Sequence, residues 1–211
     1  MKKNPNSNIP DLVLEKSLLD KGFSCIVGID EVGRGSWAGP VYVGGYVYTP
    51  SIKQIVGVKD SKLLSPQNRE RLYPEIAIKG NYKIGIGEVE MINKLGIGRT
   101  IKELIGEMIE KFKDLNAYFL IDGYFNYDFG KNTRQVIKGD IMHYSISAAS
   151  ICAKVERDRY MVQLATTYDK WCLEKNKGYG TANHIASLKT YGISPIHRTN
   201  YKPISKLIIH S

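Results

Sequence analysis

The stretch from Cys25 to Val43, CIVGIDEVGRGSWAGPVYV, constrains the fold more than any other part of the 211-residue sequence. An apolar run ends in two adjacent acids, Asp30 and Glu31, and a second apolar run begins after a glycine-rich turn. Two like charges at the end of a buried strand repel each other and lose favourable hydration. We therefore expect strands over residues 23–30 and 41–48, and a positive group beside the acids that compensates their charge.

Composition and charge narrow the class of protein. The formal net charge is +9, and an excess of Lys and Arg favours a polyanionic partner because contacts with phosphates release counterions. The widely spaced Cys25, Cys152 and Cys172 form no C-x-x-C pair, which argues against a disulfide framework or a zinc site and favours a reducing cytoplasm. No apolar run approaches the ~20 residues of a membrane span, and the polar N-terminus does not resemble a signal peptide.

Apolar periodicity and turn residues predict an α/β fold. We expect strands at residues 23–30, 41–48, 81–90, 117–122 and 134–140. We expect helices within residues 1–22 and at 66–78, 98–112, 144–171 and 181–192, followed by a mostly irregular tail. The strand at 117–122 follows a helical crossover and is expected to run parallel to the first strand. Both would then end at the same edge of the sheet, where open α/β folds place their sites.

Four acids lie at or just past the end of a predicted strand: Asp30, Glu31, Asp122 and Asp140. Gathered at one edge they would bind a divalent cation, and an all-oxygen set favours Mg²⁺ or Mn²⁺ over Zn²⁺. Two such ions about 3.5–4 Å apart form a site for in-line phosphoryl transfer. Each acid taken alone is better explained as a turn former or a helix cap, and only the four together favour a metal site. Side chains alternate along a strand, so Asp30 and Glu31 cannot both face one ion from a regular strand.

The glycine-rich turn allows a second interpretation. Residues 33–38 match the loose G-x-G-x-x-A fingerprint of dinucleotide-binding folds. That fingerprint has to open a helix, whereas Pro40 and a run of Val and Tyr follow here. The sequence therefore argues against a dinucleotide site.

Six motifs occur in the order found in the ribonuclease HII family: GIDEVGRGSWAGPV, KDSKLLS, FLIDG, KGD, SISAASICAKVERD and KGYGT followed by His. The chain resembles this family over about residues 26–198. The resemblance implies a ribonuclease H-like fold, with a mixed central sheet flanked by helices and a C-terminal helical extension. It also implies one catalytic domain over residues 1–211, with a core at about 23–143 and the extension at about 144–211.

The resemblance also implies an activity and its residues. The family hydrolyses the RNA strand of RNA–DNA hybrids and nicks 5′ to single ribonucleotides in duplex DNA, which leaves a 3′-hydroxyl and a 5′-phosphate. The implied catalytic metal ligands, for Mg²⁺ or Mn²⁺, are Asp30, Glu31, Asp122 and Asp140. The implied substrate contacts are Gly33, Arg34 and Gly35 at the ribose 2′-hydroxyl, Tyr179 on the same ribose, and Lys59, Lys62 and Lys154 along the phosphates. A monomer is expected, and the sequence identifies no protein partner.

The chain departs from the family pattern at two places. Ser36-Trp37 stands where Pro-Leu is usual, and Leu63 stands where a second lysine is common. We interpret Asp158 as structural and expect it to pair with Arg157. We interpret the four histidines as caps, core residues or surface groups and not as metal ligands: His143, His184, His197 and His210. Two alternatives stay open: another metal-dependent nuclease on the same fold, and a nucleic-acid-binding protein without turnover.

Overall fold

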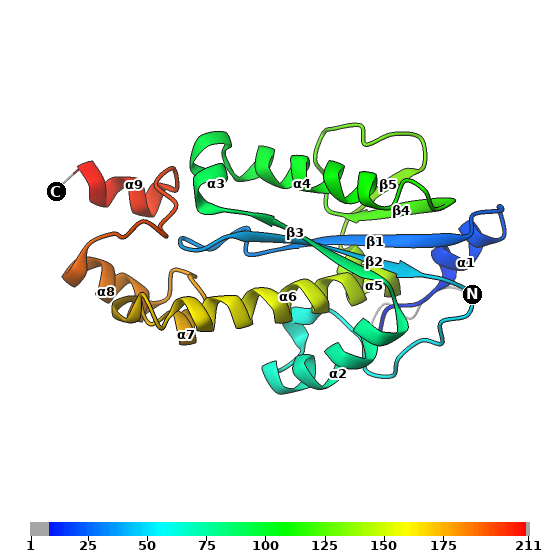
Figure 1. Cartoon of the computed structure of the whole chain (residues 1–211), viewed down its shortest axis with the longest axis horizontal. Coiled ribbons are helices and arrows are strands. Elements are labelled where there is room, and N and C mark those ends of the chain that lie inside the picture. The colour runs from blue at the N-terminus through cyan, green and yellow to red at the C-terminus, as the bar shows by residue number, and fades with distance from the viewer. Residues whose placement is uncertain (1–8, 210–211) are drawn as a thin grey trace.

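The computed structural model describes residues 9–209 of the chain. Within these residues one mixed sheet has the strand order β3-β2-β1-β4-β5 (Figure 1). As the sequence predicts, β1 pairs antiparallel with β2 and parallel with β4. The strands are β1 (Cys25–Val32), β2 (Val41–Tyr48), β3 (Tyr82–Gly87), β4 (Ala117–Asp122) and β5 (Thr133–Val136).

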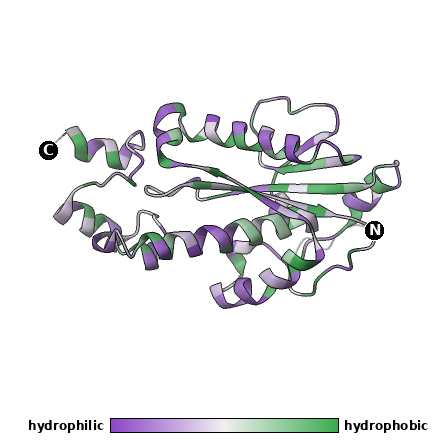
Figure 2. Ribbon diagram, in the orientation of Figure 1, coloured by the Kyte–Doolittle hydropathy of each residue, from purple (hydrophilic) through white to green (hydrophobic). Residues whose placement is uncertain are grey.

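Helices cover both faces of this sheet, with α4 on one face and α6 on the other (Figure 1). The helices are α1 (Val13–Leu19), α2 (Pro66–Lys79), α3 (Val89–Leu95), α4 (Ile97–Lys111), α5 (Gly139–Met142), α6 (Tyr144–Leu164), α7 (Leu173–Asn176), α8 (Ala182–Tyr191) and α9 (Lys202–Ile209). Two short 3-10 turns are η1 (Ser61–Leu63) and η2 (Asp169–Trp171). Figure 2 shows hydrophobic strands between helices that carry polar residues on their outer sides.

Glycines let α6 lie close to the sheet. A Cβ on Gly28 of β1 would overlap the backbone of Ser145, and one on Gly44 of β2 would overlap the carbonyl of Ala149. On the opposite face, larger side chains of α4 such as Met108 fill the space against β1, β2 and β4. Because α6 approaches so closely, its middle turns reach the C-terminal end of β1, where the acidic residues lie.

Two predicted strands are shorter than expected. The strand predicted for residues 134–140 ends at Val136, and Asp140 lies in α5. Lys138 takes a left-handed conformation, with a φ of 58°, and this turns the chain out of the sheet before Asp140. The strand predicted for residues 81–90 ends at Gly87, because Glu88 already begins the turn into α3.

The long helix and the tail also differ from the prediction. α6 ends at Leu164 rather than near residue 171, and the Thr166 hydroxyl bonds back to the carbonyl of Gln163 in the turn that follows. The end of the tail forms α9 rather than a loop, because Ile204 is buried against apolar side chains of the extension. Such packing stabilises a helix that is too short to be stable alone.

The segment after α6 packs against the loop between β1 and β2. Ala38 of that loop belongs to the same buried cluster as Trp171, Leu188 and Ile204. Figure 1 shows the extension at the end of the molecule where this loop lies, beyond the edges of α3 and α6. The C-terminal extension therefore supports the residues that follow the acidic pair.

Two further observations concern the class of protein. No helix within residues 9–209 is long and apolar enough to cross a membrane. Cys25, Cys152 and Cys172 are all free thiols, and the first two are buried. Burial raises the pKa of the Cys152 thiol to about 12, so this side chain is uncharged in the folded chain at neutral pH.

Candidate metal centre

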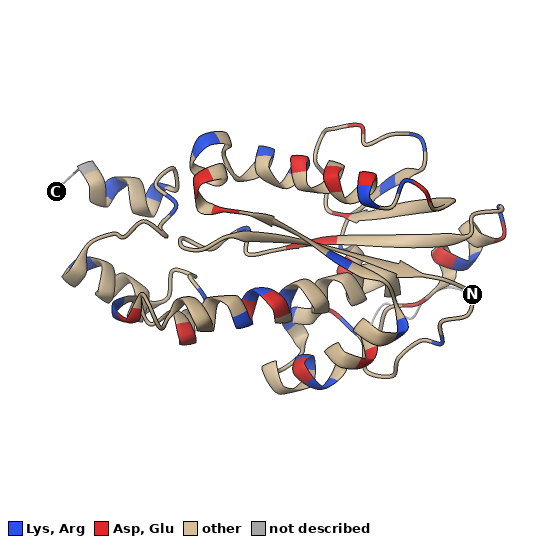
Figure 3. Ribbon diagram, in the orientation of Figure 1, with Lys and Arg blue, Asp and Glu red and all other residues tan. Residues whose placement is uncertain are grey.

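Asp30 and Asp122 lie side by side because of the strand register. β1 and β4 run parallel with Gly28 paired to Leu120, and each aspartate stands two residues further along its strand. Side chains two residues apart share a face of the sheet, and Gly28 contacts α6. Both carboxylates therefore project from the α6 face. Figure 3 shows acidic residues in the middle of the sheet, and basic and acidic residues intermixed on the neighbouring helix α6.

Asp140 joins this pair from α5. The backbone N–H of Gly139 donates a 2.6 Å hydrogen bond to Oδ1 of Asp122, which ties the start of α5 to the end of β4. One carboxylate oxygen from each of Asp30, Asp122 and Asp140 then lies within 4.8 Å of the others. The prediction that Asp140 ends a strand is wrong, but the turn at Lys138 still brings its side chain to the same edge of the sheet.

Burial makes these neighbouring carboxylates costly to ionise. Burial raises the pKa of Asp30 well above its usual value, and the charges of Glu31 and Asp122 raise it further. Burial and the charge of Asp140 raise the pKa of Asp122. Lys62 Nζ lies 2.8 Å from Oδ2 of Asp140 and supplies one positive charge. Three carboxylates beside one ammonium fit a divalent cation, and oxygen ligands suit Mg²⁺ or Mn²⁺.

Glu31 lies near the three aspartates but outside their group. β1 continues to Val32, so Glu31 is inside the strand, and the alternation of side chains directs it away from Asp30. Its Oε1 accepts a 3.3 Å hydrogen bond from Nη1 of Arg34. Burial raises the pKa of Glu31, and Arg34 opposes that rise. Glu31 lines the same cleft as Asp30 but stands outside the group of three carboxylates.

Two buried arginines hold the loop between β1 and β2. Arg198 donates from Nε to the carbonyl of Gly39 at 2.9 Å and from Nη1 to the carbonyl of Gly33 at 2.8 Å. Arg157 donates from Nη2 to the Ser36 hydroxyl at 2.8 Å. Both guanidinium groups are buried, and these oxygens replace part of the water that each would otherwise bind, while Nη2 of Arg198 has no hydrogen-bond partner among the described residues. The loop is thereby held from inside the protein.

The glycines on either side of Arg34 have different structural roles. Gly33 has a φ of 91°, which favours glycine, and a Cβ there would overlap the guanidinium of Arg157. A Cβ on Gly35 would lie 4.0 Å from Cε1 of Tyr179, so the backbone of Gly35 faces that ring without a side chain between them. The loop leads into β2 and not into a helix, which excludes the dinucleotide fingerprint.

Two buried histidines support the backbone at Tyr179. Nε2 of His184 and Nε2 of His197 are 3.1 Å apart. The backbone N–H of Ser194 donates to Nδ1 of His197 at 2.9 Å, so the His197 proton lies on Nε2 and is donated to His184. His184 then carries its proton on Nδ1 and donates it to the carbonyl of Tyr179 at 3.0 Å. His210 lies outside the described residues.

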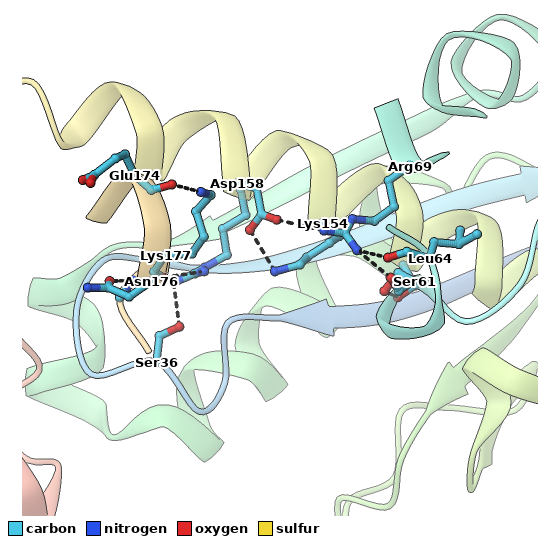
Figure 4. Close-up of polar contacts among 12 residues, drawn as sticks. Ser36, Ser61, Leu64, Arg69, Lys154, Asp158, Glu174, Asn176 and Lys177 are labelled. Carbon is cyan, nitrogen blue, oxygen red and sulfur yellow. Dashed lines mark hydrogen bonds and ion pairs between the residues drawn. The ribbon is translucent and has the colours of Figure 1, made fainter. Parts of the chain in front are cut away.

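Asp158 pairs with two cations on the wall of the cleft (Figure 4). Its carboxylate oxygens lie 2.8 Å from Nζ of Lys154 and 3.5 Å from Nη2 of Arg69. The predicted pairing with Arg157 is wrong, because the Arg157 guanidinium turns toward Ser36 instead. Asp158 thus fixes two positive groups beside the metal site.

A cleft of about 580 Å³ contains most of the predicted site. Its lining includes Asp30, Glu31, Gly33, Arg34, Gly35, Lys62, Asp122, Lys154 and Tyr179, together with Ser61, Arg69 and Ser150. Lys59 instead lines a separate groove with residues 54–58. Sequence reasoning does not find Arg69, Arg157 or Arg198 as site residues. The only signal for Arg157 is its place inside the motif SISAASICAKVERD.

A mixed sheet that gathers three carboxylates at neighbouring strand and helix ends, beside a loop held by buried arginines, is the arrangement of a metal-dependent hydrolase with the ribonuclease H-like fold. The family model described as "Ribonuclease HII" matches residues 27–204. The chain belongs to the ribonuclease HII family and is a ribonuclease H, a metal-dependent endonuclease.

Relatives and solved structures agree with this assignment. Ribonuclease HII of Aliarcobacter butzleri is 43% identical over 178 residues, which cover 84% of this chain and 90% of the relative. Ribonuclease HII of Bacillus subtilis is 40% identical over 192 residues, which cover 90% of this chain and 74% of the relative. The PCNA:RNase HII complex from Archaeoglobus fulgidus contains a chain that is 27% identical with a TM-score of 0.73, covering 86% of this chain and 96% of that chain. The predicted fold class is confirmed.

Proposed function

We propose that this ribonuclease H cuts the RNA strand of RNA–DNA hybrids and nicks duplex DNA 5′ to a single embedded ribonucleotide, leaving a 3′-hydroxyl and a 5′-phosphate. One observation carries the proposal: Asp30 and Asp122, two of the three grouped carboxylates, line the same cleft as the glycine-flanked Arg34 and Tyr179, and Asp140 stands within the same group. Residues that can contact a sugar therefore lie beside carboxylates that suit phosphodiester hydrolysis.

The loop and the tyrosine can recognise a ribose through shape and hydrogen bonding. The 2′-hydroxyl is the group that distinguishes RNA from DNA. The open backbone at Gly35 admits close approach, and the Tyr179 ring supplies a flat apolar surface opposite it. Arg157 and Arg198 hold the loop from behind, so its position does not depend on the substrate. Preorganised contacts of this kind favour selective binding of one sugar.

The acidic residues support a divalent metal, Mg²⁺ or Mn²⁺, with two ions proposed when substrate is bound. Asp30, Asp122 and Asp140 would hold it, and when bound it supplies the positive charge that activates water and stabilises the leaving oxygen. Glu31 holds Arg34 in the present structure, and its predicted role as a ligand stays a prediction. Lys62 offers its ammonium to phosphate oxygens at the same edge.

Several proposals about the whole chain remain predictions. We propose one catalytic domain over residues 1–211, with a core at about 23–143 and the extension after it. A cytoplasmic monomer is also a prediction. The sequence identifies no protein partner, and the solved relative from Archaeoglobus fulgidus is titled as a complex with PCNA. We propose Lys154 as a phosphate contact, whereas the groove that contains Lys59 supports no role for it at the cleft.

The test maps the products of one labelled substrate. A duplex DNA with one ribonucleotide is incubated with Mg²⁺, with Mn²⁺ or with EDTA, and the product ends are determined by mass spectrometry. We expect one cut 5′ to the ribonucleotide, with a 3′-hydroxyl and a 5′-phosphate, and no cut in EDTA. Asp30→Asn should abolish the cut made with Mg²⁺ or Mn²⁺. The control Asp114→Asn, which changes an exposed acid, should not. Binding without any cut would support a non-catalytic nucleic-acid-binding protein instead.

A further inference from the structure

The metal cleft continues into a hollow on either side. A groove of about 670 Å³ between α2, α6 and α7 shares Arg69, Lys154 and Tyr179 with the cleft. A second hollow of about 410 Å³, between α4 and the loop after β4, shares Arg34 with it. The three depressions therefore adjoin one another on the surface of the protein. Only the middle depression is explained by the metal site and the ribose contacts.

The second hollow, here called the aromatic–basic groove, is lined by Arg34, Gly98, Arg99, Lys102, Tyr124, Phe125 and Asn126. Of these described lining residues, three are cations, two are aromatic and none is acidic. Arg99 and Lys102 stand three residues apart on α4 and so face the same side of the helix. Arg99 Nε also lies 3.0 Å from Glu103, which is exposed to solvent and screens only part of its charge.

The loop of the aromatic–basic groove is ordered by its own contacts. Gln135 of β5 accepts from the backbone N–H of Phe125 and donates to the carbonyl of Tyr127, both at 2.7 Å. The Lys102 ammonium lies 5.1 Å from the centre of the Tyr127 ring. Tyr124 is 71% exposed, although the loop that carries it is held in place. A large aromatic side chain presented to solvent on a fixed loop is typical of a binding surface.

Arg34 connects the aromatic–basic groove to the site of cleavage. Its guanidinium is 5.9 Å from the centre of the Phe125 ring and 3.3 Å from Oε1 of Glu31, so one residue contacts both regions. A nucleic acid in the cleft must continue beyond it in both directions, because its length exceeds that of the cleft. The cations of the groove lie where one of these flanks leaves the cleft.

We propose that the aromatic–basic groove binds the sugar–phosphate backbone of the substrate duplex on one side of the cut, a proposal that rests on the proposed function. Arg99 and Lys102 neutralise phosphates, and Tyr124 packs its ring against a sugar and donates its hydroxyl to a phosphate oxygen. A protein partner is disfavoured because the groove adjoins the substrate cleft at Arg34 and three of its lining residues are cations.

The test compares duplexes that differ in the length of the flank on each side of one ribonucleotide. One has a long flank on the 5′ side of the cut, one has a long flank on the 3′ side, and one has short flanks on both. Binding in EDTA is measured by fluorescence anisotropy over a range of KCl concentrations, and cleavage is measured separately with Mg²⁺. The variant is Arg99→Ala/Lys102→Ala, and the matched control removes two exposed lysines elsewhere, Lys94→Ala/Lys111→Ala.

We expect the variant to weaken binding about tenfold on one long-flank duplex only, and to lower the slope of log affinity against log salt there by about 2. Its kcat at saturating substrate should stay unchanged. The inference is overturned if the variant binds all three duplexes as the control does. It is also overturned if the variant loses the same affinity for both long-flank duplexes and for the short duplex. If the wild-type chain cuts none of the three duplexes, the proposed function fails instead.

Discussion

Protonation of the buried His184–His197 pair should destabilise the fold as the pH falls. Burial lowers the pKa of His197 from 6.5 to about 4, and the neighbouring His184 acts in the same direction. Between these two values the unfolded chain binds a proton at this residue and the folded chain does not, so unfolding takes up a proton. The contribution of the neutral His197 to the free energy of unfolding is fully present above pH 6.5 and is lost as the pH falls toward about 4.

The hydrogen bonds of His197 explain the direction of this effect. Ser194 occupies the only free lone pair, on Nδ1, and the proton on Nε2 points to His184. A second proton would break the bond from Ser194 and place a charge in a fully buried ring. The difference between a pKa of 6.5 and one of about 4 corresponds to about 3 kcal/mol of unfolding free energy.

Urea unfolding at pH 7 and pH 5 measures this effect. We expect the wild-type chain to lose about 2 kcal/mol more between the two pH values than His197→Asn, because the other titrating groups are common to both. The variant starts from a lower stability, so the comparison uses the change with pH and not the absolute values. Equal changes in the two proteins, or an NMR titration of His197 with a pKa above 6, would refute the reasoning.

Three further predictions concern the charge of Asp30, the packing of α6 on the sheet and the contacts of Arg198. Asp30→Asn should abolish cleavage yet raise the Tm in EDTA by about 2–4 °C, because it removes a buried repulsive charge; a fall in Tm would contradict the electrostatic account. Gly28→Ala should cost about 3 kcal/mol of unfolding free energy in a denaturant titration, because its Cβ would overlap the backbone of Ser145, whereas Gly98→Ala, with open space around it, should not destabilise. Arg198→Lys retains the charge but loses the forked contacts to the loop, so kcat/KM on a ribonucleotide-containing duplex should fall about tenfold while the far-UV spectrum is unchanged.

The arrangement of the metal centre was largely predictable from local patterns. An apolar run that ends in Asp30 and another that ends in Asp122 indicate two buried strands, and the crossover between them predicts parallel pairing. Alternation along β1 then separates Glu31 from Asp30, which the structure bears out. Periodicity failed for Asp140, because a strand followed by Lys-Gly-Asp gives no local signal that the chain turns into a short helix.

The contacts that hold the loop between β1 and β2 were not predictable from the sequence. Arg157 and Arg198 resemble ordinary surface cations, and more than a hundred residues separate each from the loop that it holds. Burial of a guanidinium without a carboxylate depends on several backbone carbonyls that meet only in the folded chain. The same reason applies to the contact between Asp158 and Arg69, which comes from α2, whereas Lys154 is only four residues from Asp158 on α6.

The most direct test of the account replaces one oxygen atom in the substrate. Two duplexes are identical except that one position carries either a ribonucleotide or a deoxyribonucleotide, and single-turnover cleavage is measured at that position with Mg²⁺. Because the cleft places Gly35 and Tyr179 together with Asp30 and Asp122, we predict cleavage only when the 2′-hydroxyl is present. Equal rates on the two duplexes would contradict the proposal that the loop at Gly35 and the Tyr179 ring recognise the ribose at the metal centre.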